Sequence, residues 1–281
     1  MVENGPFVDL HLHSTCSDGG DTPEEIVLKA SKLGFSCVSI TDHDTCKGYK
    51  KAHGAALKHG VELISGIEVS TSLGNRSVHI LGYMVNPKSE AIEKIVSTAE
   101  KGRLERMKRI VSKLCKLGYR VDIGGVIRFT GEGVLGRFLL AKYLVSIKQF
   151  KSTHEVFSKV LGDEKPAFEP VPGFSPSEAI ELISEAGGVS SLAHPGGSFS
   201  TEEIEGFIKA GLDGIEAFTP HHGPADEQKY MDIASRHNLL VTGGSDSHGN
   251  PDYRRQIGSV KLPYRLVESI KERTAQEVTT G

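Results

Sequence analysis

The sequence predicts an α/β fold in which a parallel sheet, open or closed into a barrel, carries a small inserted domain. Strand-like and helix-like segments alternate along most of the chain, which is the pattern of parallel strands joined by crossover helices. The length of 281 residues is normal for an α/β barrel. The stretch 89–174 interrupts the alternation and is too long for a single connection.

The chain begins with a strand at 6–13, PFVDLHLH, in which apolar and polar residues alternate. A helix is expected at 22–34, where Thr22 can cap the first turn and Pro23 suits the first helical position. The segment CVSITDHD at 37–44 has the composition of a short buried strand. The other elements expected before the interruption are a helix at 48–60 and strands at 61–70 and 77–85.

The interruption starts with the long amphipathic segment 89–118, which predicts one helix or two. The rest of it, 119–174, shows no clear pattern, and we expect 89–174 to form an inserted domain. The alternation then resumes. The elements expected there are helices at 175–188, 202–211 and 225–238, strands at 189–195, 212–218 and 239–248, and a marginal eighth strand at 256–263.

The composition limits the class of protein. Hydrophobic residues make up 38% and charged residues 25%, which suffices for a buried core, and a net charge of −3 does not indicate a polyanionic partner. The four cysteines form no CxxC pair and are expected to be reduced thiols. The first residues lack the pattern of a signal peptide, and no apolar run is long enough to span a membrane. We therefore expect a cytoplasmic protein without membrane contact, and infer no obligate protein partner.

Histidines and acids gather where the expected strands end. His11 and His13 close the first strand, and their spacing places both side chains on one face. Other histidines and acids follow later strands, and the carboxyl ends of barrel strands meet at one mouth, where active sites are built. Such a gathering indicates metal ligation. The nine candidate ligands are His11, His13, Asp18, His43, Glu68, His79, His194, Asp246 and His248.

Each of these residues has a simpler interpretation when it is considered alone. An isolated histidine is usually a hydrogen-bonded structural or surface residue, and an isolated Asp usually caps a helix or forms a turn. The joint pattern favours the metal site. The histidines expected to be solvated helix residues without a role are His53, His59, His154 and His237.

The charge of such a site indicates what it binds. Three carboxylates among the candidates and about three divalent ions would leave a net charge of about +3, which attracts hydroxide and a phosphate dianion. Glu68 is suited to bridge two ions because a carboxylate has two oxygens, whereas an imidazole ligates through one nitrogen. The chemistry expected of this arrangement is attack on phosphorus by a hydroxide that bridges the metals.

Six motifs resemble, in order and spacing, those of the PHP (polymerase and histidinol phosphatase) superfamily: DLHLHSTCSDG, ITDHD, GIEVS, VHILGY, LAHPGG and GGSDSHG. The resemblance implies a distorted (β/α)7 barrel at 1–88 and 175–281, a lid domain at 89–174, and a site for two to three divalent ions. Mn²⁺, Fe²⁺ or Zn²⁺ are implied, and Mg²⁺ is compatible. The implied ligands are His11, His13, Glu68 and Asp246 for one ion, Glu68, His79 and His194 for the second, and Asp18, His43 and His248 for the third.

The insertion resembles the lid of one branch of that superfamily, in LGRFLLAKYLV (135–145) and FSKVLGDEKPAF (157–168). The branch hydrolyses nucleotide monophosphates and 3′,5′-bisphosphates and includes 5′→3′ exoribonucleases. Where its lid motif reads roughly GRPHIARAL, this chain has Phe138 for the proline and Leu139 for the histidine. Any contact that this histidine makes with substrate in relatives is therefore missing here. The segment TPHHGPADEQ also resembles the branch, with His222 at its usual histidine.

These resemblances predict a metal-dependent phosphoesterase acting on a nucleotide such as AMP or adenosine 3′,5′-bisphosphate (pAp), or on short RNA ends. Glu68, Asp246, Arg137 and His222 are the expected catalytic residues, and Arg137, His222 and Lys142 are expected to bind substrate. The alternatives are a histidinol-phosphate phosphatase, against which the lid argues, and a non-catalytic metal-binding module. A metal-dependent amidase is a fourth option, but such barrels usually bridge their metals with lysine where this chain has Glu68.

Overall fold

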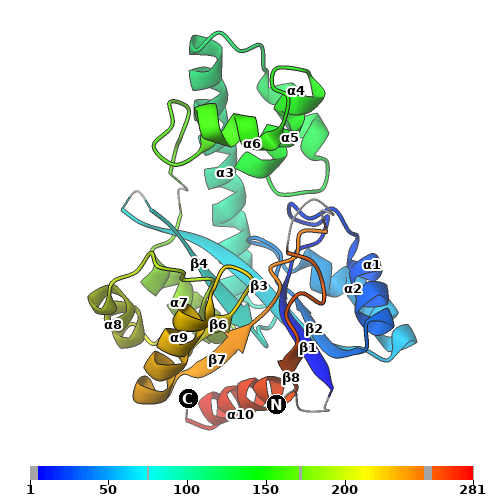
Figure 1. Ribbon diagram of the computed structural model, residues 1–281, viewed down its shortest axis with the longest axis vertical. Helices are drawn as coiled ribbons and strands as arrows, with labels where there is room; N and C mark the ends of the chain where they lie inside the picture. Colours follow the sequence, from blue (N-terminus) through cyan, green and yellow to red (C-terminus); the bar gives the residue numbers. More distant parts are fainter. Residues whose placement is uncertain (1–5, 75, 171–172, 250–254, 281) are drawn as a thin grey trace.

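The structure is a computed structural model that describes residues 6–74, 76–170, 173–249 and 255–280. The first five residues, used above to argue against a signal peptide, lie outside the described residues. One sheet of eight strands, in the spatial order β7-β6-β5-β4-β3-β2-β1-β8, forms the centre (Figure 1). The strands are β1 (Phe7–Leu12), β2 (Phe35–Ile40), β3 (Glu62–Leu73), β4 (Arg76–Tyr83), β5 (Val189–Leu192), β6 (Gly214–Phe218), β7 (Leu240–Gly243) and β8 (Leu262–Pro263).

The sheet curls into a nearly closed barrel. Neighbouring strands pair in parallel from β1 to β3 and again from β5 to β7. Beyond the end of β7, Ser247 forms a parallel bridge with Leu12, and its carbonyl accepts a 2.9 Å hydrogen bond from the His13 N–H. The first and last parallel strands therefore meet, which confirms the expected distorted β/α barrel.

Strand β4 corrects the expectation of a wholly parallel sheet, because it runs antiparallel to both β3 and β5. A parallel crossover needs a dozen or more residues, and the chain has only two residues between Leu73 and Arg76. Strand β8 is also antiparallel to its neighbour β1, and it covers only two residues of the expected strand at 256–263.

The helix start predicted from Thr22 and Pro23 is confirmed. At α1 (Pro23–Lys32), the Thr22 hydroxyl accepts from the Glu25 N–H at 3.2 Å, and the Glu25 carboxylate accepts from the Thr22 N–H at 2.8 Å. This reciprocal pair satisfies two donors that the first turn leaves open. The other helices around the barrel are α2 (Lys47–His59), α7 (Pro176–Glu185), α8 (Thr201–Lys209), α9 (Pro224–His237) and α10 (Arg265–Thr280).

Helix α10 has no counterpart among the predictions from sequence. Its residues Leu266, Val267 and Ile270 are buried in one apolar cluster with Val8 of β1. Figure 1 shows α10 across the end of the barrel opposite the lid. The helix thus closes the bottom of the barrel and leaves the other mouth for the site.

The lid is built on α3 (Glu90–Lys116), a single helix where the sequence left one or two open. Near its start Ile92 and Ile95 pack into the barrel core, and near its end Ile110 and Leu114 pack into a separate lid core. One continuous helix therefore links both cores, as Figure 1 shows. The division at 89–174 stays a prediction. The remaining lid helices are α4 (Ile123–Thr130), α5 (Arg137–Ser146), α6 (Thr153–Val156) and the π-helix η1 (Phe157–Leu161).

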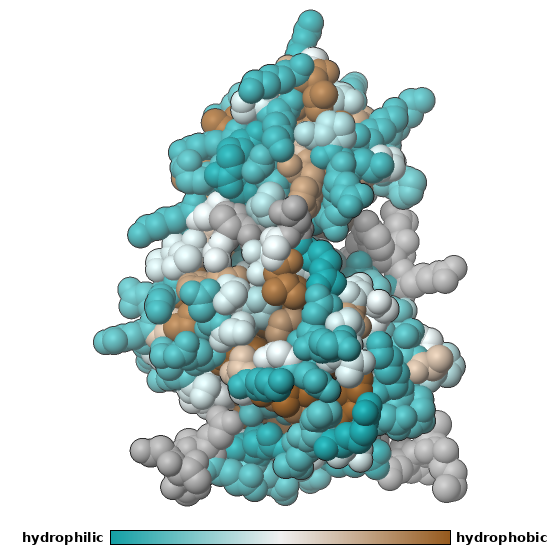
Figure 2. All heavy atoms as spheres, turned by 90° about the vertical axis from the view of Figure 1, so that its left-hand side faces the viewer, coloured by the Kyte–Doolittle hydropathy of each residue, from teal (hydrophilic) through white to brown (hydrophobic). Residues whose placement is uncertain are grey.

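The outer surface is mostly polar where Figure 2 shows it, with apolar residues confined to small areas over the lid and the barrel. Among the described residues, no helix is both long enough and apolar enough to cross a membrane.

Candidate metal centre

The candidate ligands on the parallel strands lie at the carboxyl ends of these strands, at one mouth of the barrel. His11 lies near the end of β1, and His13 follows directly after it, so both point to the same side. Both side chains are buried. The candidates after the other parallel strands are His43 after β2, His194 after β5, and Asp246 and His248 after β7.

Glu68 and His79 reach the same mouth in a way that corrects the sequence expectation. Glu68 was expected to end the third strand, but β3 continues to Leu73. His79 lies in the first half of β4 and pairs with Ser70 of β3. Because β4 is antiparallel, its first half lies beside the second half of β3, and this brings His79 Nδ1 to 3.0 Å from Glu68 Oε1.

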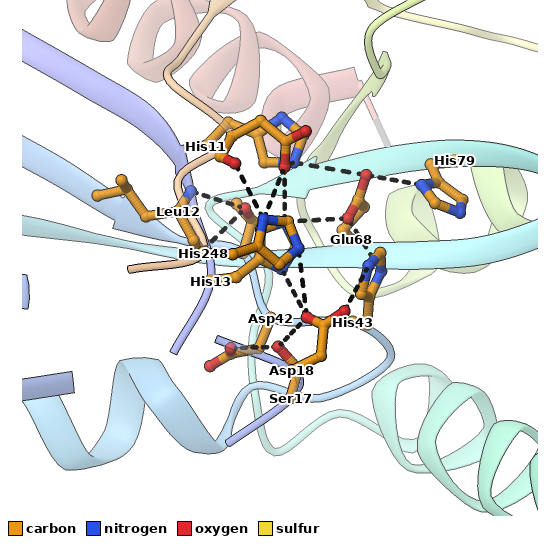
Figure 3. A network of polar contacts seen from close by, with 12 residues as sticks. His11, Leu12, His13, Ser17, Asp18, Asp42, His43, Glu68, His79 and His248 are labelled. Atoms are coloured by element: carbon orange, nitrogen blue, oxygen red, sulfur yellow. Dashed lines mark hydrogen bonds and ion pairs between the residues drawn. The ribbon is translucent and has the colours of Figure 1, made fainter. Parts of the chain in front are cut away.

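Glu68 stands at the centre of the cluster (Figure 3). Its side chain is 1% exposed, and its two oxygens face different imidazoles. One carboxylate can therefore serve two cations. Oε1 lies 3.0 Å from His79 Nδ1, 3.1 Å from His194 Nε2 and 3.4 Å from His11 Nε2, and Oε2 lies 2.9 Å from His43 Nδ1 and 3.2 Å from His13 Nε2.

The spacing of these donor atoms fits bound cations. His79 Nδ1 and His194 Nε2 are 3.3 Å apart, close to the roughly 3.3 Å that separates nitrogen ligands about 2.0 Å from a tetrahedral ion. Buried polar atoms normally have hydrogen-bond partners. Several buried atoms here have none among the described residues, namely His11 Nε2, both ring nitrogens of His13, His43 Nδ1 and Glu68 Oε2.

The donors form overlapping groups, each close enough to surround one ion. All nine candidates from the sequence belong to at least one group. The groups are His13, Asp18, His43 and His248; His11, His13 and Asp246; His11, Glu68 and His194; and His43, Glu68 and His79.

At His13 and Glu68 the neighbouring charges outweigh the effect of burial on the pKa, whereas burial keeps the pKa of His79 below its ordinary value. Burial lowers the pKa of His13, but the nearby carboxylates of Asp246 and Glu68 raise it to about 10. Burial raises the pKa of Glu68, yet the charges of His43 and His79 contribute to holding it well below its usual range. Glu68 and Asp246 therefore stay ionised inside the protein, and a buried anionic carboxylate is a favourable ligand for a cation.

Two candidate ligands occupy backbone conformations that are rare for residues other than glycine. His194 has a φ of 27° and Asp246 a φ of 48°. Such positions cost about 1–3 kcal/mol each and cluster at functional sites. The turns after β5 and β7 thus adopt an unfavourable backbone conformation that directs these two side chains toward the cluster.

Glu216 of β6 positions two of the candidates, and the sequence did not reveal it. Its Oε1 lies 3.0 Å from His11 Nδ1, and its Oε2 accepts a 2.6 Å hydrogen bond from the His194 N–H. With Nδ1 occupied, the His11 ring presents Nε2 to the cluster, as carboxylates do for histidine ligands of metals. The available signal was an acid inside the buried strand GIEAF.

Asp42 plays a similar part for the loop that carries Asp18. Its Oδ1 accepts from the Ser14 N–H and the Ser17 hydroxyl, both at 2.7 Å, and its Oδ2 accepts from the Ser14 hydroxyl at 2.6 Å. Figure 3 shows Asp42 beside Ser17 and Asp18. The loop is thereby held against the strand that leads to His43.

The cluster forms the floor of a cavity of about 640 Å³. Candidate ligands, the lid and the loops after β5 and β6 contribute to its walls. From the lid, Arg137, Phe138 and Phe157 line it. Its size suits a nucleotide-sized ligand.

Arg137 and Lys142 take different positions. Arg137 lines the cavity, and its Nη1 donates to the Leu161 carbonyl at 3.0 Å and to Asp163 Oδ1 at 2.7 Å. Lys142 is not among the lining residues, and its Nζ lies 4.5 Å from the centre of the Phe138 ring. Of the two, Arg137 lies at the cavity wall, while Lys142 packs over the ring of Phe138.

His222 does not face the cavity, contrary to the expectation that it binds substrate. It is buried, its Nδ1 lies 2.8 Å from the Ala217 carbonyl, and its Nε2 accepts from the Gly196 N–H at 3.0 Å. The adjacent His221 lines the cavity instead, with Nε2 3.3 Å from Asp246 Oδ2. The sequence analysis also missed Arg255, which lines the cavity and donates to Asp246.

A barrel mouth with a buried cluster of imidazoles and carboxylates under a nucleotide-sized cavity defines a metal-dependent phosphoric ester hydrolase. The chain belongs to the PHP family, since a PHP domain is matched over residues 9–165.

Known proteins resemble the chain over nearly its whole length. It is 33% identical to a 3′,5′-nucleoside bisphosphate phosphatase of Chromobacterium violaceum, over 89% of this chain and 90% of that protein. It is 32% identical to a 5′-3′ exoribonuclease of Haemophilus influenzae, over 85% of this chain and 89% of that protein. A predicted metal-dependent phosphoesterase of Bifidobacterium adolescentis has a crystal structure that matches with a TM-score of 0.86 at 31% identity, covering 95% of this chain and 96% of the other.

Proposed function

We propose that this protein removes a phosphate from nucleoside 3′,5′-bisphosphates such as pAp. The observation that carries the proposal is the Glu68-centred cluster facing a cavity into which the lid presents Arg137. One phosphate would lie over the cluster and the other within reach of the lid. The relative of Chromobacterium violaceum with a bisphosphatase name supports this choice.

We infer that about two to three divalent cations occupy the cluster. His11, His13, Glu68 and Asp246 would hold one ion, Glu68, His79 and His194 a second, and Asp18, His43 and His248 a third. The mixture of imidazole nitrogen and carboxylate oxygen suits Mn²⁺, Fe²⁺ or Zn²⁺. Asp18 adds a hard oxygen donor, so the third position is compatible with Mg²⁺ as well.

When bound, such cations lower the pKa of a water molecule and neutralise charge on the phosphoryl oxygens. The chain's own residues supply the rest. Glu68 and Asp246 stay ionised and fix the cluster, and Glu216 keeps Nε2 of His11 directed inward. Arg137 offers a planar fork to a second phosphate, which fixes the orientation of the ester.

A panel of phosphate esters tests this proposal. We expect kcat/KM for pAp to exceed that for AMP by at least about tenfold, since one charge-assisted hydrogen bond contributes about 1.5–3 kcal/mol. Histidinol phosphate should be a poor substrate. A short 5′-phosphorylated RNA belongs in the panel because of the relative of Haemophilus influenzae. A clear preference for histidinol phosphate would contradict the proposal. A preference for the RNA would contradict pAp as the substrate and indicate that the enzyme acts on RNA ends.

A further inference from the structure

Arg103 of the lid helix α3 joins the lid to the barrel through a buried network. Its side chain is 8% exposed. Nε donates to Asp44 Oδ2 at 2.8 Å, and Nη2 donates to the same oxygen and to the Ser70 hydroxyl, the latter at 2.7 Å. Nη1 donates to the Leu135 carbonyl at 3.4 Å. One planar guanidinium therefore holds β3, the loop after β2 and the loop before α5 together.

On the barrel side, this network fixes the residue next to a candidate ligand. Asp44 follows His43 and has a left-handed φ of 54°. Its N–H donates to the Glu68 carbonyl at 2.9 Å, and its Oδ1 accepts from the Ser70 N–H at 2.7 Å. A buried carboxylate that loses its cationic partner is strongly destabilised. Without Arg103, Asp44 would move toward water, and His43 would move with it.

On the lid side, the network fixes the segment that leads to the cavity. Leu135 lies two residues before Arg137, and Arg137 is the first residue of α5. The N–H of the preceding Val134 donates to the Ser17 carbonyl at 3.0 Å, next to the candidate ligand Asp18. The same lid segment thus contacts the barrel directly beside Asp18 and, through Arg103, beside His43.

We propose that Arg103 is a positioning residue. It fixes the lid segment that carries Arg137 relative to the cation position formed by Asp18, His43 and His248. It contacts neither substrate nor cation itself. Its part in substrate binding rests on the proposed function, whereas its part in cation binding does not. A misplacement of about 1 Å is enough to slow a reaction about a hundredfold, so the register between lid and cluster matters.

The test compares Arg103→Met and Arg103→Lys with the control Arg106→Lys. Arg106 is also buried on α3, but it donates to the Glu169 carbonyl within the lid, at 2.9 Å. Lysine places a single ammonium in both positions and lacks the planar fork of arginine. The measurements are KM and kcat for pAp, and the Kd of Mn²⁺ for the metal-free protein by calorimetry.

We expect Arg103→Met to raise KM for pAp and the Kd of at least one Mn²⁺ site by at least about tenfold each, with Arg103→Lys between it and the wild type. Arg106→Lys should change both by less than about twofold. Equal effects of the two lysine variants would overturn the proposal, as would unchanged KM and Kd in folded Arg103→Met. If Arg103→Met does not fold, the two lysine variants decide. If the wild type does not hydrolyse pAp, the proposed function fails, and the Mn²⁺ affinities still decide on Arg103.

Discussion

Replacing Glu68 with Gln should lower kcat by at least about a thousandfold and reduce the metal content of the purified protein. The amide has the same shape, but it carries no charge and cannot bridge two cations. Loss of several kcal/mol of charge stabilisation in the transition state corresponds to at least about a thousandfold in rate. The imidazoles around Glu68 would also lose the carboxylate that holds their donor atoms at 2.9–3.4 Å. Turnover and metal content by elemental mass spectrometry measure the two effects.

Glu62→Gln provides the matched control, because Glu62 lies on the same strand β3 but outside the cluster. Its carboxylate pairs with Lys271 at 2.6 Å and accepts from the Tyr264 hydroxyl at 2.6 Å. We expect this variant to keep kcat within about twofold of the wild type. Normal activity and metal content in Glu68→Gln would show that the cluster does not serve catalysis.

Replacing Arg137 with Ala should reduce kcat/KM for pAp by about ten- to a hundredfold, mainly through KM. The guanidinium lies at the cavity wall, where it bonds Asp163 and stacks 5.1 Å from the Phe168 ring centre. Its planar fork suits bidentate phosphate binding, and removal of one such charge-assisted bond costs about 1.5–3 kcal/mol. Hydrolysis of p-nitrophenyl phosphate should change little, since that ester has no second phosphate.

The comparison of the two esters separates the roles open to Arg137. Equal losses on both would place it at the scissile phosphate or in the structure of the lid. No loss on either would make it a surface charge paired with Asp163. Arg109→Ala is the control, because Arg109 is a half-exposed lid arginine that donates to Glu169 at 3.0 Å and does not line the cavity.

Local sequence patterns predicted many of the helices and strands. The features that they did not predict depend on how consecutive elements are connected. The start of α1 followed from Thr22 and Pro23, because capping depends only on neighbours in sequence. The antiparallel direction of β4 depended instead on the short link between Leu73 and Arg76. Helix α10 was not predicted. It follows the two-residue strand β8, which is too short to be recognised in the sequence as part of a strand–helix unit.

The candidate site shows the same division. His11 and His13 stood out because a strand spacing of two places both on one face. Glu216 and Arg103 could not be found in that way, since their partners lie far away in sequence. Glu216 Oε1 and His11 Nδ1, for example, are 205 residues apart and yet 3.0 Å from one another. His222 was expected to bind substrate because it matches the usual histidine of the branch, and that match does not tell which of two adjacent side chains points into a cavity.

The most direct test of the account is a metal titration of the protein after exhaustive removal of metal. The metal-free protein should keep its fold and show no turnover of pAp. Activity should return as Mn²⁺ is added and should reach its plateau at about two to three bound equivalents per chain, counted by elemental mass spectrometry. Full turnover by protein that demonstrably contains no metal would contradict the central claim that the Glu68-centred cluster works through bound cations.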